Sequence, residues 1–181
     1  MGEQHKKHNR REHLNDFHLN VAGEYVYDGA LYACQNDDAK QRRSKRAVWG
    51  MAAILTVAVA AGGCIPAPGM QNCFYVLLPY LGEFLGAASV IWALAKLGTD
   101  WGTVREYNYK KSVAVLPVRT AVTAVFSGLG IVCELIFFFV NDHAGQTFFA
   151  LLYVLLKLTA LLSVLVLRAE IMQAEWDKLP K

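Results

Sequence analysis

Four long apolar runs constrain this chain more than any other feature of its sequence. They cover roughly residues 47–65, 74–97, 116–140 and 147–168. Each run reaches the ~20 residues that an α-helix needs to cross the hydrocarbon of a membrane. None shows the alternation of a membrane β-strand, and only helices or closed barrels satisfy their backbone polar groups in lipid. The sequence therefore predicts an all-α integral membrane protein with four transmembrane helices in a compact bundle.

The distribution of Lys and Arg predicts how this bundle is oriented. Of the 18 basic residues, nine precede residue 47 and none falls in the connections 64–73 and 141–146. Four more lie between the second and third runs: Lys96, Arg105, Lys110 and Lys111. By the positive-inside rule, we expect a multi-pass protein of the cell membrane with both termini in the cytoplasm. The net charge of +3 is then a topology signal, and it predicts no nucleic-acid partner.

Residues 1–46 are expected to form a cytoplasmic basic tail that contains a β-hairpin at 24–33. Asp28-Gly29 suits a type I′ turn, which would place Tyr27 opposite Ala30. Because an isolated hairpin is marginal in water, it needs lipid headgroups, the middle loop or another subunit to pack against. A locally ordered aromatic spacer is the alternative. The residues predicted to dock a partner are Tyr25, Val26, Tyr27, Leu31 and Tyr32.

The segments that flank the apolar runs are predicted from composition alone. Residues 35–46 form a polar linker whose basic cluster favours anionic headgroups at the cytoplasmic face. Because 46 largely polar residues precede the first run, that run is predicted to be a retained helix rather than a secretory signal. Residues 169–181 continue the last helix until Pro180. Four of the five histidines lie within residues 1–20, but no zinc spacing is complete, so no metal site is predicted.

Two cysteines lie in the connection that is predicted to face outward. Cys64 and Cys73 are the first and last of its ten residues, on the side of the membrane where disulfides persist. We therefore expect a disulfide between them. Cys34 and Cys133 are expected to be inert thiols.

Three charged residues interrupt the apolar runs. Counted from the outer helix ends at 1.5 Å per residue, Glu83 and Lys157 lie about 14–15 Å deep and Glu134 about 9 Å deep. The sequence predicts that Glu83 and Lys157 pair, while Glu134 is often protonated. Two interpretations stay open: the charges fix the register of the helices, or they form a proton, cation or ligand site.

Glycines on two of the runs predict close contacts between helices. Gly82 and Gly86 form a G-x-x-x-G pair beside Glu83, and Gly128 and Gly130 offer a second small surface. We expect all four glycines to lie at helix-packing interfaces.

The function predicted from these features is that of an accessory or scaffolding membrane subunit. Its expected partners are the lipid bilayer and either another membrane protein or a second copy of the chain. The alternative is a small proton- or cation-coupled transporter that uses Glu83, Glu134 and Lys157. The sequence contains no P-loop, no H-E-x-x-H and no G-x-S-x-G, so neither an enzyme nor a cofactor is predicted.

Overall fold

A computed structural model describes residues 17–19, 23–27, 29–98, 101–141 and 147–179. Four long helices dominate it, and each carries a stretch long and apolar enough to cross a membrane, as in a multi-pass membrane protein. These helices are α1 (Asp38–Cys64), α3 (Phe74–Leu97), α5 (Leu116–Val140) and α6 (Thr147–Met172). Two short helices accompany them: α2 (Pro68–Asn72) and α4 (Glu106–Lys111).

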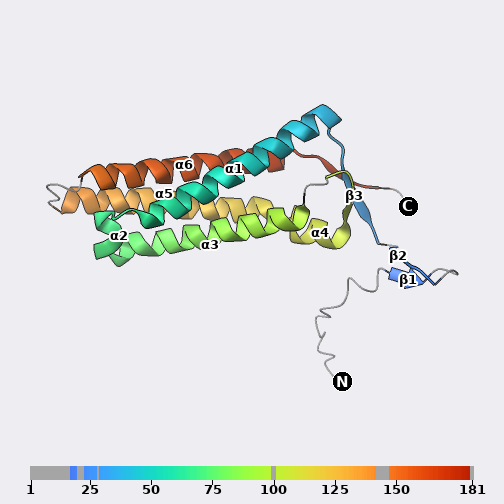
Figure 1. Cartoon of the computed structure of the whole chain (residues 1–181), viewed down its shortest axis with the longest axis horizontal. Coiled ribbons are helices and arrows are strands. Elements are labelled where there is room, and N and C mark those ends of the chain that lie inside the picture. Colours follow the sequence, from blue (N-terminus) through green and yellow to red (C-terminus); the bar gives the residue numbers. More distant parts are fainter. Residues whose placement is uncertain (1–16, 20–22, 28, 99–100, 142–146, 180–181) are drawn as a thin grey trace, which may run out of the picture.

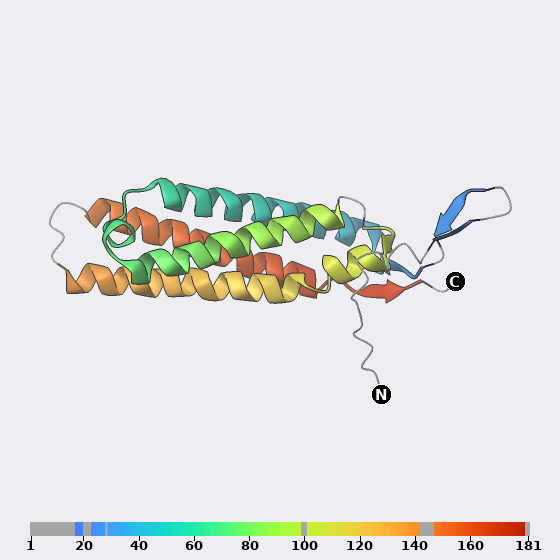
Figure 2. The ribbon, with the colours of Figure 1, turned by 90° about the horizontal axis from the view of Figure 1, so that it is seen from below.

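The long helices form a ring around a common axis (Figures 1 and 2). α1 packs against α6, α6 against α5 and α5 against α3, while the contact between α3 and α1 is the least extensive of the four. Consequently α3 and α6 are diagonal across the axis. α2 closes one end of the bundle, called here the α2 end, and the strands lie near the other, called the sheet end.

The helix boundaries follow local sequence signals. α3 and α5 begin and end where the apolar runs predict. Pro117 lies in the first turn of α5, where its missing N–H is tolerated, and Gly98 follows α3 with φ +70°. The predicted linker at 35–46 is wrong, because α1 already begins at Asp38. Its residues are mostly good helix formers, so the helix extends from the apolar run into the basic cluster.

A three-stranded antiparallel sheet lies at the sheet end. β3 (Leu31–Cys34) is its central strand, between β4 (Val104–Arg105) and β5 (Trp176–Lys178). The predicted helical extension over 169–181 is therefore only partly right, since α6 ends at Met172 and the chain then forms β5. Pairing with β3 satisfies backbone groups that a longer helix would have satisfied internally.

The predicted hairpin at 24–33 is wrong. β2 (Tyr25–Tyr27) pairs with the preceding strand β1 (Phe17–Leu19), in the register Phe17↔Tyr27, whereas β3 belongs to the other sheet. A type I′ turn needs positive φ at both central residues, and Gly29 has no positive φ. Since β3 gains a neighbour on each edge, it forms more backbone hydrogen bonds than a two-stranded hairpin offers.

Aromatic side chains attach the three-stranded sheet to the bundle. Tyr32 stacks on Tyr109 with ring centroids 4.1 Å apart and planes at 4°. Trp176 lies 6.0 Å from both Tyr109 and Trp101, and Trp101 is buried against the ends of the long helices. The sheet thus shares one core with the membrane-type bundle.

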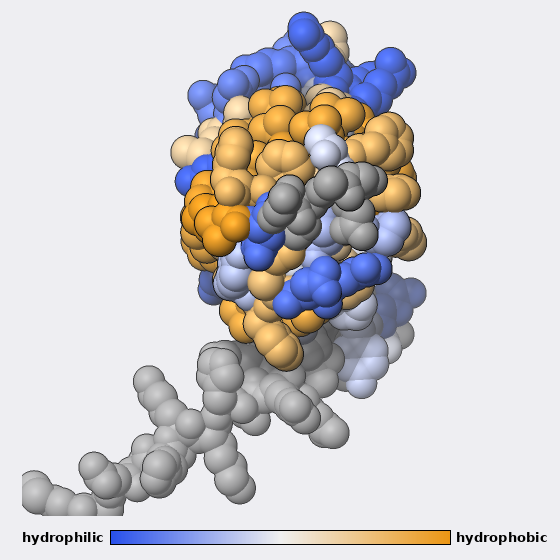
Figure 3. All heavy atoms as spheres, turned by 90° about the vertical axis from the view of Figure 1, so that its left-hand side faces the viewer, coloured by the Kyte–Doolittle hydropathy of each residue, from blue (hydrophilic) through white to orange (hydrophobic). Residues whose placement is uncertain are grey.

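The outer flank of the bundle is apolar. Figure 3 views the molecule from the α2 end and shows mainly hydrophobic residues around the bundle. Large exposed side chains on the flank include Leu85, Val125, Phe139 and Leu162. Such a surface is expected of helices that face lipid tails.

Candidate functional site

The interior face of α5 carries polar and small residues at helical spacing, and the interior faces of α3 and α6 each carry one charged residue. On α5 the buried positions Thr123, Ser127, Gly130 and Glu134 recur every three or four residues. Residues with this spacing lie on one face of a helix. Because α3 and α6 present Glu83 and Lys157 to the same interior, helix packing gathers the charges at the bundle axis.

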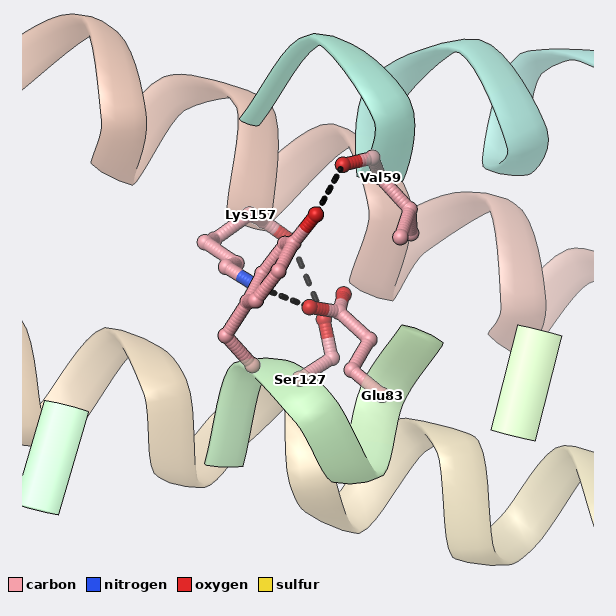
Figure 4. Close-up of polar contacts among 5 residues, drawn as sticks. Val59, Glu83, Ser127 and Lys157 are labelled. Atoms are coloured by element: carbon pink, nitrogen blue, oxygen red, sulfur yellow. Dashed lines mark hydrogen bonds and ion pairs between the residues drawn. The ribbon is translucent and has the colours of Figure 1, made fainter. Parts of the chain in front are cut away.

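The predicted pair between Glu83 and Lys157 is present. Lys157 Nζ donates to Glu83 Oε2, and the two side chains are 3% and 0% exposed (Figure 4). Because α3 and α6 are diagonal, this ion pair bridges the bundle axis instead of joining neighbouring helices. Removing one partner would leave the other charge buried and uncompensated, which costs about 3–5 kcal/mol in proteins.

Two tyrosines enclose the ammonium group. Lys157 Nζ lies 4.6 Å from the ring centroid of Tyr80 and 5.1 Å from that of Tyr153, within the range of cation–π attraction. The Tyr80 hydroxyl donates to the Val59 carbonyl oxygen at 3.4 Å, which links α3 to α1 (Figure 4). Ser127 Oγ donates to the backbone oxygen of Lys157 at 3.3 Å, so α5 also contacts this layer.

Glu134 is fully buried and takes no part in the ion pair. Its carboxylate lies against Gly69 of α2, where a Cβ atom would overlap it. Among the described residues, neither carboxylate oxygen of Glu134 accepts a hydrogen bond of good geometry, although the Gly69 backbone N–H lies close enough to interact with the carboxylate. Glu83 Oε1 and the Tyr153 hydroxyl also lack hydrogen bonds of good geometry to described residues. The set Glu83, Glu134, Lys157, Tyr80 and Tyr153 is called the axial cluster below.

The formal charges of the axial cluster do not cancel. With both carboxylates ionised, one ammonium leaves one negative charge in excess. A charge at the centre of a membrane costs at least about 2.5–3.5 kcal/mol on insertion scales, so buried charges there pair or become neutral. The arrangement can therefore hold one additional positive charge.

The four predicted packing glycines differ in their surroundings. A Cβ on Gly82 would press against Phe126, and one on Gly86 would lie 2.6 Å from Thr123 Oγ1, so both let α3 approach α5 closely. Gly130 faces Lys157, whose Cε would lie 3.6 Å from such an atom. The prediction for Gly128 is wrong, since nothing lies within 4 Å of the same position.

The predicted disulfide between Cys64 and Cys73 is also wrong. Both thiols are free, as are those of Cys34 and Cys133. Cys64 ends α1 and Cys73 directly precedes α3, while the intervening segment folds into α2. This folded connection holds the two helix ends without a covalent link.

Sequence reasoning missed three residues of the site. Tyr153 precedes Lys157 by four residues and Tyr80 precedes Glu83 by three, so each shares a helix face with its charged neighbour. That spacing could have identified both tyrosines from the sequence. No such spacing identifies Gly69, because its contact with Glu134 depends on where α2 packs.

Comparisons of the chain with protein-family models, with curated proteins and with solved structures gave no match. Within the described residues, no group of three or more His, Cys, Asp or Glu is placed to hold a metal ion. Three of the four histidines in the basic tail lie outside these residues, and the side chain of His18 is not described either. A proposal for the function therefore rests on the geometry of the axial cluster and of the protein surface.

Proposed function

We propose that this chain is an accessory or scaffolding subunit of the cell membrane, inserted with both termini in the cytoplasm. Support for the orientation comes from the sheet end, which carries Lys and Arg on α1 and around α4. These residues are Lys40, Arg42, Arg43, Lys45, Arg46, Arg105, Lys110 and Lys111. Anionic headgroups of the cytoplasmic leaflet would attract them.

The observation that carries the accessory function is the β1–β2 ribbon. This ribbon projects away from the bundle beyond the sheet end (Figure 2). Tyr25 is 74% exposed and Val26 is 40% exposed on it. A two-stranded ribbon of this length is marginal alone, and an exposed aromatic residue on it favours a partner protein.

A second surface suits a partner within the membrane. Where α1 and α3 make the least extensive contact, a groove of about 360 Å³ opens between them. The exposed aromatic residues Phe84 and Trp92 line this groove together with several small residues. Small residues let another transmembrane helix approach closely, so the groove can receive a helix of the partner. The small residues are Thr56, Ala60, Ala87, Ala88 and Ala95.

The test is native mass and composition after extraction in a mild detergent. We expect a stoichiometric second protein that is lost in Tyr25→Ser/Val26→Ser and reduced in Ala88→Trp, which fills the groove. Matched controls are Phe74→Ser, an exposed aromatic at the α2 end, and Leu81→Trp on the exposed flank of α3. Tyr32→Ser is unsuitable because Tyr32 is stacked within the protein. Retention of the partner by the ribbon variant, or a chain that purifies alone, would contradict the proposal.

The axial cluster supports a second candidate, a small proton- or cation-coupled carrier. The specific observation is that one buried carboxylate oxygen of Glu83, Oε1, and both of Glu134 lack hydrogen bonds of good geometry among the described residues. The test is flux into liposomes under an imposed H⁺ or Na⁺ gradient. Flux should be lost in Glu134→Gln, and flux equal to that of protein-free vesicles would reject the carrier while leaving the accessory function untouched.

A further inference from the structure

Helix α2 covers the end of the bundle at which Glu134 lies. It packs against α3, α5 and α6, and its residues Pro68 and Gly69 are buried. The wall that faces the Glu134 carboxylate is the backbone of Gly69, because any larger residue there would overlap the carboxylate. The missing side chain at Gly69 thus leaves room for the carboxylate, and α2 covers it at this end of the bundle.

The Glu134 carboxylate at this end and the Tyr153 hydroxyl both lack hydrogen bonds of good geometry to described residues. Both oxygens of Glu134 are fully buried. On α6, the ring of Tyr153 lies beside the Lys157 ammonium, and its hydroxyl is buried as well. Glu134 lies close enough to both side chains to act on them electrostatically. The two buried carboxylate oxygens of Glu134 carry one uncompensated charge and can bind a proton or a small, hard cation.

The charged groups around Glu134 limit the charge of that cation. The ammonium of Lys157 is paired with Glu83, so its single positive charge cannot cancel the charges of both carboxylates. α2 contributes no titratable side chain. One positive charge cancels the excess of the cluster, whereas a divalent ion would create an excess of the opposite sign. The other titratable groups that face this region are Tyr75 and Tyr80 of α3, Tyr153 of α6, Cys133 of α5, and the thiols of Cys64 and Cys73.

We propose that Glu134 binds one monovalent cation, a proton or Na⁺, beside Gly69 of α2. The Glu83–Lys157 pair remains closed. This proposal names the binding site that the carrier candidate would use, and any transport of the cation rests on that candidate function. Binding is tested without measuring flux, so the cation site at Glu134 and the carrier function can each be rejected without the other.

The first experiment uses a membrane-soluble carbodiimide, which reacts with a carboxyl group only when that group is protonated. The whole protein in liposomes is treated, and the modified residue is located by mass spectrometry. We expect an adduct on Glu134 whose yield falls as the pH is raised from weakly acidic to weakly alkaline. Protection by Na⁺ but not by choline would assign Na⁺ as a second occupant, and absence of protection would assign the proton alone.

Lys157→Gln is the control for access of the reagent. In this variant Glu83 loses its ion-pair partner, so Glu83 should become reactive as well. An adduct on Glu83 of the variant, with none on Glu134 at any pH, would overturn the proposal. In wild-type protein we expect no adduct on Glu83.

A second measurement decides the case in which neither carboxylate reacts. Thermal unfolding of wild-type protein in detergent should shift to higher temperature at weakly acidic pH or with added Na⁺. Glu134→Gln should be insensitive to the agent that stabilises the wild type, because its amide carries no charge to neutralise. Equal responses of wild type and Glu134→Gln to pH and to Na⁺ would overturn the proposal. Gly69→Ala should weaken the wild-type response, and Gly62→Ala, where a Cβ meets Tyr153 only at 3.9 Å, is its matched control.

Discussion

The interior of the bundle and the strands at the sheet end follow different rules. In the bundle, Lys157 carries the one buried ammonium among the described residues, and its pairing with Glu83 was predictable from helix depth alone. At the sheet end, β3 had several possible partner strands and paired with β4 and β5 instead of with the neighbouring β2. A charge in an apolar interior has few ways to be satisfied, whereas a strand edge accepts any extended segment that packing brings close.

The largest effect is expected from breaking the ion pair. Glu83→Gln leaves Lys157 charged and unpaired, and it should lower the free energy of unfolding by about 3–5 kcal/mol. The double variant Glu83→Gln/Lys157→Gln removes both charges and should recover much of this loss. Unfolding in mixed micelles measures both variants. Additive losses in the double variant would contradict a direct pairing across the bundle axis.

A smaller effect on stability is expected from alanine substitutions at Gly86 and Gly128, which form a matched pair. A Cβ at Gly86 would lie 2.6 Å from Thr123 Oγ1 and 3.3 Å from its Cα, so α3 and α5 must separate in Gly86→Ala. We expect a loss of about 1–3 kcal/mol. Gly128→Ala adds a methyl group in open space and should be neutral or stabilising by up to ~1 kcal/mol. Thermal unfolding of Gly86→Ala and Gly128→Ala measures this contrast. Equal losses of stability in the two variants would contradict the helix faces assigned to these glycines.

The smallest effect concerns the tyrosines of the two sheets. Tyr32→Ser removes the stack on Tyr109, which contributes about 0.5–1.5 kcal/mol beyond the buried area. Tyr25→Ser changes a largely exposed residue and should stay within about 0.5 kcal/mol of wild type. Hydrogen exchange of the β3 amides is the measurement. Faster exchange in Tyr25→Ser than in Tyr32→Ser would favour the hairpin that the sequence suggests.

The sequence by itself determined the four long helices and the pairing of Glu83 with Lys157. Both follow from the low polarity expected around these segments, where each backbone group must bond within its own helix and each charge needs a specific partner. The faces of α3 and α5 followed from the same periodicity, except at Gly128.

Only the tertiary structure decided the strand order, the free thiols and the position of α2 over Glu134. Strand pairing depends on which segments the packed helices bring together, so the turn signal at Asp28-Gly29 was outweighed by the two neighbours available to β3. Likewise, Gly69 acquires its role because α2 packs on three helices at once. Contacts between segments distant in the chain leave no local pattern from which they could be predicted.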